Sequence, residues 1–314
     1  VQPPLTGGGF LLPFSPSTML ERLSLLLLMN KLTAAKRAAI LCGLVEGGSI
    51  RAVGRMTGAD KDTVMQLLVE VGEFCSVYQD HMISNLKSTR VEADEIWSFV
   101  GAKAKSVTKS GQGDIWTWTA LDADSKLMIS WMVGQRSQAV ASDFMQDVAS
   151  RLANRVQLTT DGLTIYLPAV EKAFGWNGTD FAPLFKQYGT ETGVSGRYGT
   201  HSVCTGADKV ETMGRPNIAK ASTSYVERAN LTMRMGMRRF TRLTNEFSKK
   251  AEKHAHAVSL HFTHYNYYRP HQTLTKAAKG IKTTPAMSPG LTDRVWTVEN
   301  VLEKMEGMIG GDAS

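Results

Sequence analysis

Residues 90–97 read RVEADEIW and predict a β-strand that begins the main domain of the chain. On a strand, Glu92 and Asp94 share one face while Glu95 points to the other. An unpaired carboxylate is costly to bury, so an acid inside an apolar strand indicates a site. We take Asp94 as a candidate catalytic residue, expect Glu92 to support it from the same face, and expect Glu95 to face solvent. Taken singly, each acid is better explained as a surface carboxylate.

The segments that follow predict the rest of a sheet. Strong β-formers and short connections predict a three-stranded antiparallel meander, after which strands alternate with helices. This order is typical of a mixed sheet covered on both faces, an α/β fold with the strand order of the ribonuclease-H-like fold. The predicted elements are strands at 114–122, 126–133 and 155–160, helices at 138–153 and 166–174, and a further strand at 181–188.

Two more acids occupy similar positions. Asp161, in Thr159-Thr160-Asp161-Gly162, ends a predicted strand, where α/β sheets place ligands. Glu227, in Tyr225-Val226-Glu227-Arg228, opens a long basic helix predicted over 224–247. Simpler interpretations stay open, because Asp-Gly is also a turn signal and Glu227 also suits a helix N-terminus or an ion pair. Three converging carboxylates would hold divalent cations, since Mg²⁺ and Mn²⁺ prefer oxygen ligands.

Residues 31–80 predict a small all-α domain. Thr33, Ser49 and Asp60 are suited to cap three successive helices, and Gly58 lies in the turn between the second and third. Two short helices joined in this way form a helix-turn-helix, whose second helix enters the major groove of DNA. The exposed residues at its reading end would be Lys61, Asp62, Thr63 and Gln66, with Lys61, Thr63 and Gln66 as the candidate DNA contacts. A helical packing or dimerisation module is the alternative.

A basic stretch follows Glu227. Arg234, Arg238 and Arg242 recur every four residues and would share one helical face. With Arg239, Lys249 and Lys250 they form a candidate surface for DNA phosphates, the alternative being an ordinary solvated face. Residues 189–223 are rich in Gly, Thr and Ser and predict an irregular insertion in a domain spanning 90–275. Residues 276–314 predict a polar tail.

Composition adds little by itself. The chain has 314 residues and a formal charge of +7, which suits a polyanionic partner. Three scattered cysteines predict no disulfide framework and suit the reducing cytoplasm. Residues 1–30 predict a poorly ordered extension whose apolar run is too short to span a membrane. Because the regular pattern begins near Met29, we expect the translation start to be assigned too far upstream.

The chain resembles the transposases of the insertion sequence one family, bacterial enzymes of the Asp-Asp-Glu class. The resemblance covers residues 90–275 and is carried by DEIWSFVGAK at 94–103, by Thr160-Asp161-Gly162 and by ERANLTMR at 227–234. It implies a ribonuclease-H-like core, catalytic and metal-binding roles for Asp94, Asp161 and Glu227, and two Mg²⁺ or Mn²⁺ ions. The scattered cysteines supply no cysteine-rich finger of the kind that some relatives carry before the helix-turn-helix.

The resemblance also implies a function. A transposase would cleave double-stranded DNA at the terminal inverted repeats of its element and join the ends to target DNA. Because two DNA ends must be held together, we expect a homodimer or higher oligomer on DNA. Two alternatives stay open, a DNA-binding regulator whose catalytic core no longer works and a nuclease of the same fold.

Overall fold

The computed structural model describes residues 32–190, 202–241 and 247–310. Its centre is a mixed five-stranded sheet of order β3-β2-β1-β4-β5. The first three strands form the antiparallel meander, and β4 and β5 run parallel to β1. This order is compatible with a ribonuclease-H-like core. The strands are β1 (Arg90–Val100), β2 (Gly113–Asp122), β3 (Met128–Gly134), β4 (Gln157–Thr160) and β5 (Asp180–Phe181).

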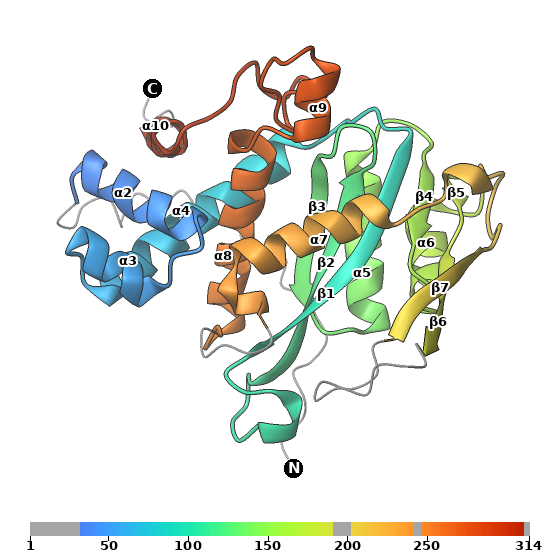
Figure 1. Cartoon of the computed structure of the whole chain (residues 1–314), viewed down its shortest axis with the longest axis horizontal. Helices are drawn as coiled ribbons and strands as arrows, with labels where there is room; N and C mark the ends of the chain where they lie inside the picture. Colours follow the sequence, from blue (N-terminus) through green and yellow to red (C-terminus); the bar gives the residue numbers. More distant parts are fainter. Residues whose placement is uncertain (1–31, 191–201, 242–246, 311–314) are drawn as a thin grey trace.

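Helices cover both faces of the sheet, as predicted for an α/β fold (Figure 1). α7 (Ser224–Gly236) lies across one face over β1 and β2, while α5 (Gln138–Arg151) and α6 (Tyr166–Phe174) cover the opposite face. α8 (Ala251–Thr263) packs against the edge strand β3 and continues into a π-helical turn at His264–Tyr268. Every residue of α8 from His254 to Thr263 is buried, so this helix belongs to the core.

The three N-terminal helices form where the capping residues predict them. They are α2 (Ala34–Val45), α3 (Ile50–Thr57) and α4 (Lys61–Met82), and the side chains of Thr33, Ser49 and Asp60 accept the expected backbone N–H bonds. α4 packs on α8 so closely that a Cβ at Gly72 would lie 2.6 Å from the carbonyl oxygen of His256. One hydrophobic core therefore runs from these helices into the sheet.

The strand predicted over 181–188 is divided in two. β5 pairs with β4 for two residues, whereas β6 (Leu184–Thr190) pairs with β7 (Ser202–Lys209) in a separate two-stranded sheet. Pro183 lies between β5 and β6, and beyond it the contact with the main sheet continues only as an isolated bridge between Leu184 and Asp161. The predicted insertion at 189–223 is thus partly regular, since β7 and a 3-10 turn at Ile218–Lys220 lie within it.

The helix predicted over 224–247 ends eleven residues early. α7 stops at Gly236, Met237 is extended (φ −126°, ψ 104°), and a 3-10 turn spans Arg238–Phe240. Glycine is a poor helix former, and the carbonyl of Gly236 closely approaches Gly47 in the turn after α2, where a Cβ would lie 2.8 Å away. Arg238 therefore does not continue the helical face of Arg234, and Arg242 lies outside the described residues.

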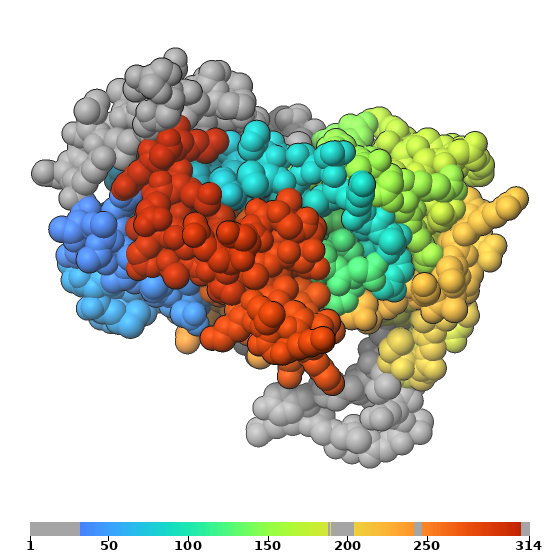
Figure 2. Space-filling view, turned by 90° about the horizontal axis from the view of Figure 1, so that it is seen from above, coloured from blue at the N-terminus to red at the C-terminus, as the bar shows by residue number. Residues whose placement is uncertain are grey.

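The C-terminal residues differ from the polar tail expected. α9 (Gln272–Ala277) is followed by a loop and by α10 (Val298–Gly310), which packs against α2 and α4. Trp296 is only 4% exposed, and its ring lies 4.4 Å from that of Tyr267 between centroids. Figure 2 shows these red residues lying between the blue N-terminal helices and the green part of the chain that holds the sheet. They join the two parts of the molecule.

Two remaining expectations concern the ends of the chain. The apolar run near residue 20 and the predicted N-terminal extension fall in 1–31, outside the described residues. Among the helices that the structure describes, none is both long and apolar enough to cross a membrane.

Candidate metal centre

The register of β1 and β4 brings the first two predicted acids to one level. Ala93 pairs with Thr160 in the parallel ladder, and each is followed directly by an aspartate. β4 ends there, while β1 continues to Val100, so Asp161 stands at the open end of a short strand beside Asp94 in the body of a longer one. Neighbouring parallel strands place residues of equal register side by side.

Asp94 is hydrogen-bonded on the face of the sheet that α7 covers. Its Oδ2 accepts a hydrogen bond of 2.9 Å from Asn230 Nδ2 on α7. The hydroxyl of Thr119 on β2 lies 3.0 Å from the Asp94 carbonyl oxygen and 3.2 Å from Asn230 Oδ1. The carboxylate is half-buried, so these contacts fix its orientation while leaving it accessible.

Glu95 does not face solvent as expected, because it is 8% exposed. The alternation predicted for β1 is present, but helix α6 covers the face to which Glu95 points. Its Oε2 accepts a hydrogen bond of 3.0 Å from the hydroxyl of Tyr166 on α6, and its Oε1 pairs with the guanidinium of Arg136. Glu95 therefore belongs to the site, because α6 covers it. The alternation of residues along β1 cannot predict that a helix covers this face.

Asp161 is oriented by its own turn. Its Oδ1 accepts a hydrogen bond of 3.2 Å from Leu163 N, and the residue forms an isolated bridge with Leu184 at the start of β6. A Cβ on Gly162 would lie 2.4 Å from the ring of Phe185. The glycine of the Asp-Gly pair thus serves a close approach of β6.

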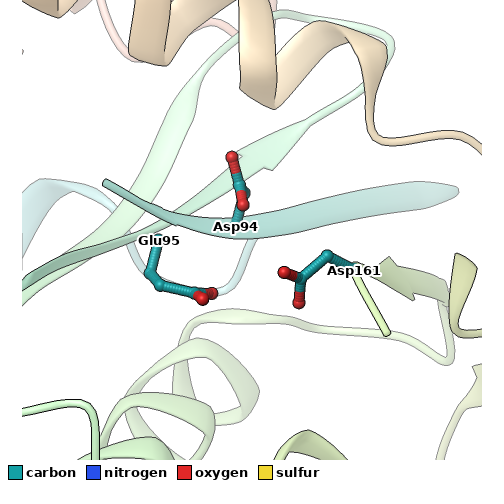
Figure 3. A group of neighbouring side chains, drawn as sticks. All are labelled: Asp94, Glu95 and Asp161. Atoms are coloured by element: carbon teal, nitrogen blue, oxygen red, sulfur yellow. The ribbon is translucent and has the colours of Figure 1, made fainter. Parts of the chain in front are cut away.

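Three carboxylates meet at this point. Asp94, Glu95 and Asp161 each offer an oxygen within 4.8 Å of the others, and no other group of this kind occurs in the described part of the chain. Figure 3 shows Glu95 and Asp161 pointing toward one another while Asp94 leaves β1 on the opposite side. We call these residues the carboxylate cluster. It surrounds the edge of β1 where β4 ends.

Glu227 lies near the carboxylate cluster but outside it. Its Oε1 lies 2.7 Å from Lys186 Nζ on β6 and accepts a hydrogen bond from the hydroxyl of Thr223. Its charge still contributes to raising the pKa of both Asp94 and Asp161. The structure therefore brings together Asp94 and Asp161 of the predicted triad, and holds the third acid in an ion pair beside them.

Glu92 has the supporting position expected from the strand pattern. It is 2% exposed, and its Oε2 accepts hydrogen bonds from the backbone N–H groups of Tyr225 (2.8 Å) and Val226 (3.1 Å). These are the second and third residues of α7, a helix whose N-cap residue Thr223 makes no side-chain cap. Glu92 therefore caps α7 from a neighbouring strand and fixes the turn that carries Glu227.

The acids at this site hold their protons more strongly than free carboxylates. Burial, followed by the charge of Asp161, raises the pKa of Asp94 to about 6. Burial raises the pKa of Glu95 to about 7, with Asp161 and Asp94 adding repulsion and Arg136 opposing it. Burial also raises the pKa of Asp161 and brings that of Glu92 to about 7. A bound cation would relieve this strain by supplying the missing positive charge.

The predicted DNA-contacting residues fall into two groups. Lys61, Arg238, Arg239, Lys249 and Lys250 line one pocket of about 670 Å³ between α3, α4, α8 and the end of α7. Arg234 is exposed on α7, Gln66 is exposed on α4 and bonded to Glu70, and Thr63 is half-buried. Whether any of them contacts DNA stays a prediction.

Several residues of the site were not expected from the sequence. Three of them come from elements outside β1 and β4, and their local sequence does not indicate a role in a site. They are Arg136 after β3, Tyr166 on α6 and Lys186 on β6. Asn230 is different, because it lies three residues after Glu227 and so shares its helical face. An asparagine at this spacing from a candidate catalytic acid could have been predicted to lie near the site.

Comparison with known proteins adds no assignment. No protein-family model matches the chain, and a search of curated proteins gives no match.

Proposed function

We propose that this protein is a metal-dependent transposase of the Asp-Asp-Glu class that cleaves DNA and transfers the cut strand. The observation that carries the proposal is the carboxylate cluster, in which oxygens of Asp94, Glu95 and Asp161 lie within 4.8 Å of one another. Such an arrangement of buried like charges is unfavourable without a cation, and active sites are where strongly perturbed carboxylates gather. The resemblance in residues 90–275 and the compatible strand order also support it.

The donor set fits a hard divalent cation. All three groups offer carboxylate oxygens, no sulfur or imidazole competes among them, and their raised pKa values reflect missing positive charge. Asp94 and Asp161 would be ligands, with Glu95 as a third that shares its charge with Arg136. Magnesium or manganese bound there would activate a nucleophilic hydroxyl and neutralise the phosphodiester. A second ion requires Glu227 to leave Lys186.

The surrounding residues then have separate tasks. Asn230 donates a hydrogen bond to Oδ2 of Asp94 and would thereby fix the orientation of this carboxylate. Glu92 accepts two hydrogen bonds from the first turn of α7 and would thereby fix the position of this turn, and of Glu227, relative to β1. Lys186, one-quarter exposed, is placed to exchange its bond with Glu227 for one with a DNA phosphate.

DNA is the substrate that the remaining features favour. The net charge is +7, and two helices, α3 and α4, lie where the sequence predicts a helix-turn-helix, which would bind DNA within this proposal. Within this proposal the protein works as a dimer or larger assembly on DNA in the bacterial cytoplasm, because two ends must be joined.

The test is an end-joining assay. The protein is incubated with Mg²⁺ and DNA carrying the sequences that flank its coding region, and the products are separated on denaturing gels. Nicks at matched inverted repeats followed by strand-transfer products support the proposal. Sequence-specific binding without nicking would identify a regulator, and cleavage of RNA–DNA hybrids without end specificity would identify a nuclease of the same fold.

A further inference from the structure

A pocket between α3, α4, α8 and the end of α7 contains no residue of the carboxylate cluster. We call it the interhelical pocket. It is open to solvent and has a volume of about 670 Å³, within the range of small-molecule sites. Its floor is apolar, and it is closed on one side where Gly47 meets the carbonyl of Gly236. The apolar residues of the floor are Leu44, Val45, Met65, Leu68, Ala257 and Leu260.

The rim of the interhelical pocket is strongly basic. Against a single acid, Asp62, the lining includes seven cationic side chains. The N-terminus of α8, which no side chain caps, also opens onto the rim, whereas Ser49 and Asp60 cap those of α3 and α4. Helix N-termini attract anions through their free N–H groups and dipoles. The cationic residues are Arg51, Lys61, Arg238, Arg239, Lys249, Lys250 and Lys253.

A buried histidine completes the lining. His261 is 9% exposed, and its Nε2 is buried without a hydrogen-bond partner. Burial, with the charges of His264 and Arg269, lowers its pKa to about 3, so the ring is neutral. A neutral imidazole has one donor and one acceptor, which suits the polar edge of a heterocycle. The Nε2 atom itself has no accessible surface, and the Nδ1–Cε1 edge of the ring lies on the side of Gly236, which also lines the pocket.

We propose that the interhelical pocket binds one unpaired nucleotide of a DNA strand, with its base over the apolar floor beside His261 and its phosphate at the basic rim. A bare phosphate would not need the apolar floor, and an apolar ligand would not need seven cations. A paired duplex is too wide to enter, whereas a nucleotide turned out of the helix fits. The inference rests on the proposed function only in taking DNA as the polymer.

The test measures binding without metal. In EDTA, fluorescence anisotropy compares a short duplex with one unpaired 2-aminopurine to the same duplex with an abasic residue there. We expect the base to improve affinity roughly tenfold, as stacking and burial of one base do. The 2-aminopurine emission should change on binding. Equal affinity for the two duplexes, or displacement of the bulged duplex by micromolar dAMP, would overturn the assignment to a nucleotide within a strand.

Variants locate the effect. His261→Phe keeps the ring volume and removes the polar edge, and Met65→Trp fills the pocket from α4, so both should abolish the preference for the unpaired base. His81→Phe, at an exposed histidine of α4, should leave it unchanged. Circular dichroism checks that each variant is folded. If His261→Phe and Met65→Trp both fold and keep the preference, the pocket is not the site.

The salt dependence of DNA affinity tests the phosphate contact at the basic rim separately. Lys253→Gln should reduce the slope of log affinity against log salt by about 0.9, the value for one lost phosphate contact, while Lys172→Gln, at an exposed lysine of α6, should not. An unchanged slope for Lys253→Gln would contradict the rim contact. Because no step requires cleavage, a protein that prefers the unpaired base without cutting DNA would refute the proposed function alone.

Discussion

Lys186 Nζ on β6 lies 2.7 Å from Glu227 Oε1 on α7, beside the carboxylate cluster. This ion pair joins the separate two-stranded sheet to the helix that crosses the main sheet. It also neutralises the acid that the sequence resemblance assigns to the metal site. Within the proposed function, the lysine supplies the positive charge beside Glu227 that a second cation would supply.

Replacing Lys186 should therefore strengthen metal binding. Lys186→Met frees Glu227 and removes a charge that lowers the pKa of Asp161. Isothermal titration with Mn²⁺ should show affinity higher by roughly tenfold, the scale of changes beside metal ligands. DNA cleavage should nevertheless become slower if the lysine contacts phosphate. Lys172→Met on α6 is the matched control, and an affinity for Mn²⁺ that is unchanged or lower would contradict this role.

Glu92 should act on the site through α7. Glu92→Leu removes the cap from Tyr225 and Val226, and caps contribute about 0.5–2 kcal/mol. Hydrogen exchange at these two amides should accelerate accordingly, and cleavage should slow while DNA affinity is kept. Glu92→Gln, which retains a carbonyl acceptor, should restore part of the protection, whereas Glu171→Gln on α6 changes nothing. Equal protection in wild type and Glu92→Leu would show that the helix start is held otherwise.

The metal-free protein should lose stability as the pH rises. The pKa of Asp94 is raised to about 6 and those of Glu92 and Glu95 to about 7, above their ordinary values of 3.8 and 4.5. The folded state therefore binds more protons than the unfolded state between about pH 4 and pH 7, and the free energy of unfolding falls across that window.

Asp94→Asn isolates this effect. In EDTA at pH 8 the variant should melt at a higher temperature than wild type, because it removes the cost of a buried charge. The difference should vanish near pH 4. Addition of Mg²⁺ should stabilise wild type by linkage and leave the variant almost unchanged. A variant that melts below wild type at pH 8, or gains equally from Mg²⁺, would show that the site is not strained in this way.

The sheet and its first two acids follow from local signals in the sequence. Alternation in residues 90–97 and the strand that ends at Asp161 are short-range patterns, and parallel pairing of β1 with β4 aligns them. The same holds for the helix caps at Thr33, Ser49 and Asp60. Each of these elements is specified by residues that are close together in the chain.

The environment of Glu95 and Glu227 depends on contacts between distant segments. Tyr166 is 71 residues from Glu95, and the sequence around either residue does not predict their contact. Lys186 reaches Glu227 because the chain leaves the main sheet after the isolated bridge between Leu184 and Asp161 and continues as β6, which pairs with β7. The early end of α7 likewise depends on the approach of Gly236 to Gly47. Periodicity carries no information about such tertiary contacts.

The central claim is that Asp94 and Asp161 bind the cation that cleaves DNA. The most direct measurement is an Mn²⁺ titration followed by electron paramagnetic resonance, with cleavage assayed on the same samples of wild type, Asp161→Asn and the exposed control Asp293→Asn. We predict that Asp161→Asn lowers Mn²⁺ affinity by at least about tenfold and removes cleavage, while Asp293→Asn matches wild type. Wild-type metal affinity and cleavage in Asp161→Asn would contradict the account.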